Sequence, residues 1–85
     1  MTNQETGDYV VKEINKYLGV IRSAKNEAYD GFAKEKIRVL VEVLDVLDEV
    51  QTESELQTRV KALYKAHTGA LDGLKDLMQA MGVRA

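Results

Sequence analysis

Several residue types are missing from this 85-residue sequence, and each absence excludes a class of protein. There is no cysteine, so disulfide bonds and thiolate metal sites are excluded, as suits a reducing compartment. There is a single histidine and no Glu-x-x-His motif, so a di-iron site of the kind found in helical bundles is excluded. Phosphate-binding loops and nucleophile elbows are absent as well. We therefore expect no enzymatic activity, no catalytic residue, no cofactor and no metal.

Long apolar runs and an excess of one charge are also lacking. No uncharged apolar stretch approaches the ~20 residues of a membrane span. The net charge is −2 with both signs mixed, which gives no overall attraction to nucleic acid or to an anionic membrane. The opening residues, MTNQETGDY, have neither the basic nor the apolar region of a signal peptide. These features predict a cytoplasmic protein without membrane contact.

Apolar residues recur at steps of three and four along the whole chain, which is typical of amphipathic helices. We predict an all-α antiparallel bundle of three helices over residues 8–29, 32–50 and 53–81, forming a single domain over 8–85 behind a flexible N-terminus over 1–7. The signals for the helix ends are an N-cap at Asp8, a turn at Asp30-Gly31, a capping box of Thr52 with Glu55, and closure at Gly82.

The third predicted helix is long, and the sequence leaves two forms open. Gly69 and Gly73 each cost about 1 kcal/mol in a helix interior, which favours a break near Thr68-Gly69 and a fourth helix that folds back. The apolar period that runs through both glycines favours one continuous helix, and we prefer that form. His67 occupies an apolar position of this period, and we interpret it as a hydrogen-bonded structural residue.

The second predicted helix has more apolar surface than a three-helix bundle needs. Its first apolar seam contains Ile37, Leu40, Leu44 and Leu47. A second row lies beside it at steps of four, three and four, and consists of Val39, Val43, Val46 and Val50. In a three-helix monomer part of this valine row would face water, and an exposed apolar stripe usually marks an interface. We therefore predict a homodimer through the valine row, because two-fold dimers are the commonest oligomers. Coverage by a folded-back C-terminal segment is the alternative.

Charge is unevenly distributed along the chain. An acidic patch with no basic residue within its span is formed by Glu42, Asp45, Asp48, Glu49, Glu53 and Glu55. A basic patch is predicted around the first hairpin, at Arg22, Lys25, Lys34, Lys36 and Arg38. Neutralisation inside the bundle is the simplest interpretation of the acidic patch, with Lys12, Lys16, Arg59 and Lys61 as partners. Both ends of the second helix carry charge that opposes the helix dipole.

These features favour a small module that acts by protein–protein contact, in a structural, adaptor or regulatory role, with itself or another protein as partner. A first alternative is an inhibitor or immunity-like protein that presents the acidic patch, residues 42–55, to a basic partner. A second is a nucleic-acid binder that uses the basic hairpin, residues 22–38. Nucleic acid is the less favoured partner, because acidic residues interleave with the basic ones and no stacking aromatic set accompanies them.

Overall fold

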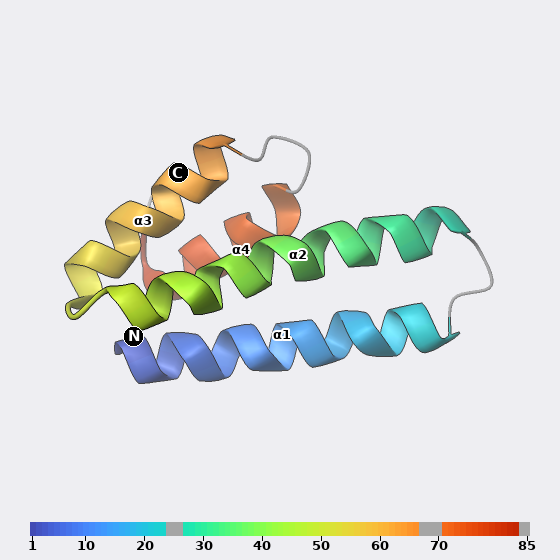
Figure 1. The fold of residues 1–85 in the computed structure, drawn as a ribbon, viewed down its shortest axis with the longest axis horizontal. Helices are drawn as coiled ribbons and strands as arrows, with labels where there is room; N and C mark the ends of the chain where they lie inside the picture. The colour runs from blue at the N-terminus through green and yellow to red at the C-terminus, as the bar shows by residue number, and fades with distance from the viewer. Residues whose placement is uncertain (24–26, 67–70, 84–85) are drawn as a thin grey trace.

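The computed structural model describes residues 1–23, 27–66 and 71–83, and these residues form an all-helical bundle with no strand. The helices are α1 (Asn3–Ser23), α2 (Glu27–Glu49), α3 (Glu53–Ala66) and α4 (Leu71–Met81). Helices α1 and α2 are long and antiparallel, α3 turns back from the end of α2, and α4 lies behind α2 (Figure 1). None of the described helices is both long enough and apolar enough to cross a membrane.

Helix α1 begins five residues earlier than the sequence analysis predicted. Residues 3–7 belong to the helix, so the predicted N-cap at Asp8 is wrong, and the segment 1–7 is not a separate tail. The cap is Thr2: its Oγ1 accepts a hydrogen bond from the Glu5 backbone N–H at 3.1 Å, and Glu5 Oε1 accepts one from the Thr2 N–H at 2.9 Å. This reciprocal pair is a capping box, and its Thr-x-x-Glu signal is present in the sequence.

The predicted turn at Asp30-Gly31 is also wrong, because α2 starts at Glu27 and runs through both residues. The backbone at Gly31 is not left-handed, and a Cβ added there would meet nothing within 4 Å. A single glycine costs a helix only about 1 kcal/mol, which packing of the rest of α2 offsets. Helix α2 therefore begins five residues earlier than predicted.

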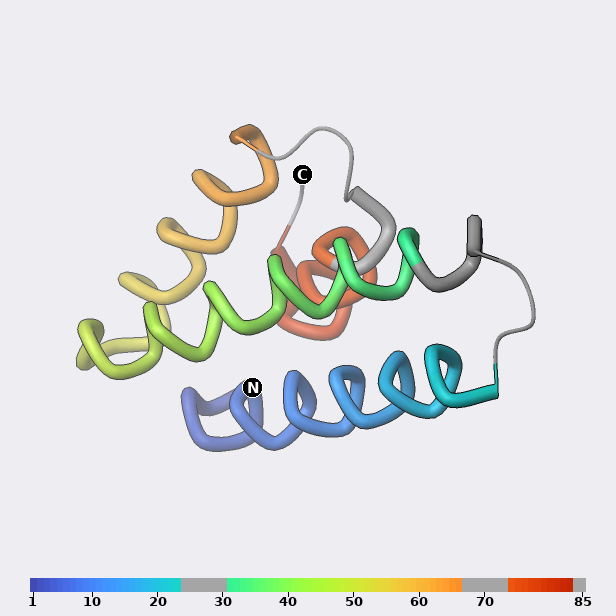
Figure 2. The backbone as a smooth tube through the Cα atoms, turned by 45° about the vertical axis from the view of Figure 1, so that its right-hand side comes forward, coloured from blue at the N-terminus to red at the C-terminus, as the bar shows by residue number. Residues whose placement is uncertain are grey.

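The described part of segment 53–81 consists of two helices that pack against each other, rather than one straight helix. Two halves of a straight helix cannot touch, so the preferred continuous form does not describe α3 and α4. Figure 2 shows α4 beneath α2 and inclined to α3. Residues 67–70 lie outside the described residues, and with them the predictions for His67 and for a break near Thr68-Gly69.

Hydrogen bonds mark the start of α3 and the end of α4 near the positions that the sequence predicted. Thr52 Oγ1 accepts the Glu55 N–H at 3.1 Å, which is one bond of the predicted capping box, whereas Glu55 Oε2 accepts the N–H of Gln51 rather than that of Thr52. At the other end, Gly82 has φ 76°, its N–H donates to the Gln79 carbonyl, and the Val83 N–H donates to the Met78 carbonyl. This pair of bonds is a Schellman motif, whose left-handed position suits glycine because glycine has no Cβ.

The core lies where α2 is covered by the other helices. Helix α4 contacts α1, α2 and α3, and its inward side chains Leu74, Leu77 and Met78 are almost completely buried. Leu56 and Val60 of α3 and Val10 of α1 close the core around them. The fold-back of α4 therefore supplies apolar cover that a three-helix bundle would lack, and the consequence is seen on α2.

Candidate protein-binding surface on α1 and α2

The valine row of α2 is covered within the single chain. Val39, Val43 and Val46 are 1%, 0% and 6% exposed, and Val50 is half-buried. The expectation that this row faces water is wrong, because α4 and α3 pack on the α2 surface that a three-helix bundle would leave open. The valine row therefore gives no support to a dimer, and a partner-binding surface has to be sought elsewhere.

Large apolar side chains are exposed on a different side of α1 and α2. Val11 and Leu18 of α1 are 46% and 37% exposed, and Val41 of α2 is 42% exposed. Val11 and Leu18 are seven residues apart, which is two helical turns, so they lie one above the other on α1. The exposed apolar surface therefore continues along α1 and crosses to the neighbouring helix.

This exposed surface lies on the side of the α1–α2 pair that α4 does not cover. Burial raises the pKa of Tyr9, and the negative charges of Glu13 and of Asp76 on α4 add to this rise, so the Tyr9 side of α1 faces α4. At 100° per residue, Val11 and Leu18 lie about 160° and 180° from Tyr9. On α2, Val41 lies about 160° from the buried Val39.

Half-buried apolar residues fill the space between the three exposed ones. They lie within about 80° of them around each helix and pack against the edge of the core. We call the resulting surface the α1–α2 face; it consists of Val11, Ile14, Leu18 and Ile21 of α1 and Ile37, Val41 and Leu44 of α2. A contiguous apolar surface of this kind usually marks a binding site.

The α1–α2 face has one basic end and one acidic end. The antiparallel register is fixed by Tyr17, which accepts a hydrogen bond from Lys36, and by Gly7, which lies against Leu47. It brings the C-terminal part of α1 beside the N-terminal part of α2. Exposed charged residues flank the face, and they are Arg22, Lys34 and Arg38 at one end and Asp8, Asp45 and Asp48 at the other.

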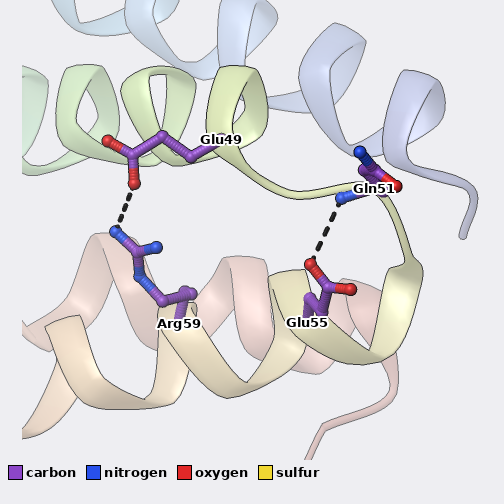
Figure 3. Close-up of polar contacts among 4 residues, drawn as sticks. All are labelled: Glu49, Gln51, Glu55 and Arg59. Atoms are coloured by element: carbon purple, nitrogen blue, oxygen red, sulfur yellow. Dashed lines mark hydrogen bonds and ion pairs between the residues drawn. The ribbon is translucent and has the colours of Figure 1, made fainter.

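The predicted acidic patch is divided among different roles. Asp45, Asp48 and Glu53 are exposed, whereas Glu42 is half-buried. Figure 3 shows the other two: Arg59 of α3 donates to Glu49 Oε2 at 2.7 Å, and the Gln51 N–H donates to Glu55 Oε2 at 3.4 Å. The predicted pairing with Arg59 is confirmed, so part of the acidic charge is neutralised within the bundle.

The predicted basic patch is not a continuous surface. Lys36 is buried; its Nζ donates to the Tyr17 hydroxyl at 3.3 Å and lies 4.1 Å from the centre of the Phe32 ring. Arg38 is exposed and lies 3.9 Å from Glu35. Arg22 and Lys34 are exposed, and Lys25 lies outside the described residues. Among the described side chains of the predicted basic patch, those that reach solvent are therefore Arg22, Lys34 and Arg38, which lie at the basic end of the α1–α2 face.

Among the side chains that the structure describes, those of residues 1–23, 31–66 and 74–83, no group of three or more acidic side chains is placed to hold a metal ion. A surface hollow of about 300 Å³ between α2 and α3 is lined by Glu49, Val50, Ser54, Glu55, Thr58 and Arg59. Its charged residues, Glu49, Glu55 and Arg59, are engaged with each other or with a helix cap. No family model matches the chain, and no curated protein or solved structure is significantly similar to it.

The spacing of Val11 and Leu18 is a signal that the sequence analysis could have used. Both residues adjoin the buried side of the first helix without belonging to it, and on sequence alone such residues are ordinary surface positions. Only the placement of α4 reveals that they adjoin Val41 on an uncovered side of the helix pair.

Proposed function

We propose that this protein is a helical protein–protein interaction module, and that it binds its partner through the α1–α2 face. The single observation that carries the proposal is the exposure of Val11, Leu18 and Val41 on one uncovered side of the α1–α2 pair. Burying three such side chains against a partner stabilises a complex by roughly 25 cal/mol per Å² of apolar surface removed from water.

A site-specific photo-crosslinker tests whether the α1–α2 face contacts another protein in the cell that makes this chain. The crosslinker is placed at Leu18 or Val41, and the matched control carries it at Lys75, which is exposed on α4. We expect protein adducts from the two positions on the α1–α2 face and none from the control. Adducts at Leu18 should disappear when Val41→Lys is added, because a lysine on the same face keeps the partner away.

Two results would count against the module. One is the absence of protein adducts from both Leu18 and Val41. The other is an adduct at Leu18 that persists at the same yield with Val41→Lys, which would mean that chance collisions produce it.

An inhibitor or immunity-like role through the acidic patch is a second proposal. Exposure of Asp45, Asp48 and Glu53 favours it. Binding of a basic protein that weakens as salt rises, and that is lost in Asp48→Lys but retained in Val41→Lys, would favour this proposal over an apolar contact. Nucleic-acid binding has less support, because Lys36 is buried among aromatic rings and cannot reach a phosphate.

A further inference from the structure

We propose that the partner on the α1–α2 face is a second copy of this chain, and that the two copies pack with each helix antiparallel to its counterpart. This inference rests on the proposed function and specifies its partner. The observation behind it is the charge distribution: the basic residues Arg22, Lys34 and Arg38 lie at one end of the face, and the acidic residues Asp8, Asp45 and Asp48 lie at the other.

Geometry allows two face-to-face arrangements with two-fold symmetry. In both, the symmetry axis lies in the plane of contact, because only then do the two copies of one face meet. An axis along the helices would place basic end on basic end and acidic end on acidic end. An axis across the helices places each basic end on the partner's acidic end. Like charges in contact are costly and opposite charges fix the register, so the second arrangement is selected.

The spacing of residues on α2 gives the position of this axis. Lys34 and Asp48 are each seven residues from Val41, and Arg38 and Asp45 are three and four residues from it. If the axis passes beside Val41, each Val41 packs on the Val41 of the other copy. Arg38 then lies opposite Asp45 of the other copy, and Lys34 lies opposite Asp48 of the other copy. Val41 and the charged residues on both sides of it are therefore all compatible with a two-fold axis that passes beside Val41.

The residues of helix α1 are arranged in the same way about Asn15. Asp8 and Arg22 are each seven residues from Asn15, and Val11 and Leu18 are four and three residues from it. Each Val11 would thus meet Leu18 of the other copy, with Asp8 opposite Arg22.

The centres on α1 and α2 lie at nearly the same height along the helix pair. The Tyr17–Lys36 contact places Asn15 beside residues 38–39, two to three residues from Val41. At 1.5 Å per residue the two centres differ by about 3 to 5 Å along the pair, which a modest helix crossing angle accommodates.

The same arrangement accounts for a charge that is unfavourable in the single chain. Asp48 lies in the last turn of α2, which contains no basic residue, so its negative charge opposes the helix dipole. In the antiparallel dimer Asp48 lies opposite Lys34 of the other copy. Arg38, whose 3.9 Å pair with Glu35 is exposed and adds little, lies opposite Asp45 of the other copy. A charge that is unfavourable within α2 is therefore compensated between copies.

Charge reversal with mixing tests the antiparallel dimer in the full chain. Arg38→Asp alone and Asp45→Arg alone each place like charges opposite one another twice per dimer. Each variant should raise the dimer dissociation constant about tenfold or more in sedimentation equilibrium. An equimolar mixture should form heterodimers within about twofold of the wild-type dissociation constant, because both contacts between the two chains are again of opposite sign. Lys75→Asp on α4 is the control, with no change expected.

Engineered cysteines give a second measurement, since the chain has none of its own. Val41→Cys should oxidise to a disulfide-linked dimer, and Ala62→Cys, exposed on α3, should not.

Three results would overturn the inference. One is a wild-type chain that is monomeric up to millimolar concentration. The second is a mixture of the Arg38→Asp and Asp45→Arg chains that fails to restore association. The third is a Val41→Cys chain that forms a disulfide with a Leu18→Cys chain but not with itself. If the chain is monomeric while Leu18 and Val41 still crosslink to another protein, the proposed binding role of the α1–α2 face is retained. Only the proposal that its partner is a second copy of the chain is then rejected.

Discussion

Lys36 shows how a charged side chain is held in a largely apolar core. It lies between two aromatic side chains, with its Nζ 4.1 Å from the centre of the Phe32 ring and 5.0 Å from that of Tyr17. The Tyr17 hydroxyl accepts its hydrogen bond at 3.3 Å. Aromatic faces attract a cation, and the aliphatic stem of lysine packs as an apolar group, so burial of Lys36 is compatible with a stable bundle.

The hydrogen bond between Lys36 and Tyr17 can be measured on its own. Tyr17→Phe keeps the ring but removes the acceptor, and it should lower the free energy of unfolding by about 1 kcal/mol. In a Lys36→Met background the same change should cost much less, because no ammonium remains to be satisfied. Urea denaturation of the four chains gives the coupling energy. Equal costs in the two backgrounds would mean that the bond contributes nothing.

Glu5 gives the cap of α1 a dependence on pH. Hydrogen bonds from Thr2 hold the pKa of Glu5 below its ordinary value of 4.5. A group whose pKa is lower in the folded state stabilises the fold above its ordinary pKa, and this stabilisation is lost as the pH falls through the folded pKa. Glu5→Ala should therefore lower the melting temperature at pH 7, and the difference from wild type should close in acid.

Melting curves recorded between pH 7 and pH 2 test this dependence. Glu53→Ala is the control, since Glu53 is an exposed acidic residue in the first turn of α3 that accepts no capping bond analogous to that of Glu5. A Glu5→Ala difference that stays constant across the whole range would contradict a role for the ionised carboxylate.

Among the helices, the two glycines that the sequence analysis treated as terminators behave differently. Gly31 lies inside α2 and Gly82 ends α4 in a left-handed conformation. What separates them is packing, because the apolar side chains before Gly82 are buried up to Met81 while the helix at Gly31 continues into the buried part of α2.

Alanine at the two glycines should have opposite effects. Gly31→Ala should raise the free energy of unfolding by up to about 1 kcal/mol, since the added methyl group meets nothing and the helix gains propensity. Gly82→Ala should lower it by about 1 kcal/mol, because φ of 76° is strained for a residue with a Cβ. Denaturant titration measures both. Destabilisation by Gly31→Ala would indicate a turn at that position after all.

At the level of the whole bundle, the fold-back of α4 decides which side of α2 is covered. It buries Val43 completely and leaves Val41 on the uncovered side. The two valines are chemically identical and two residues apart, but they lie about 200° apart around the helix, so α3 and α4 cover Val43 and not Val41.

Truncating each valine measures this difference directly. Val43→Ala should lower the free energy of unfolding by about 2 kcal/mol through lost burial and a cavity. Val41→Ala should change it by less than about 0.5 kcal/mol when the chain is studied at nanomolar concentration, where a dimer dissociates. Comparable losses at the two sites under those conditions would mean that α4 does not pack on α2 as described.

The amino-acid sequence is sufficient to predict the all-helical class, the capping bond of Thr52 and the helix end at Gly82. These features depend on the period of apolar residues and on hydrogen bonds a few residues apart, so local spacing is enough. Tertiary structure alone decided that α4 covers the valine row and that Val11, Leu18 and Val41 share an uncovered face. The direction in which a helix folds back depends on contacts between segments distant in sequence, and a single helical period does not specify them.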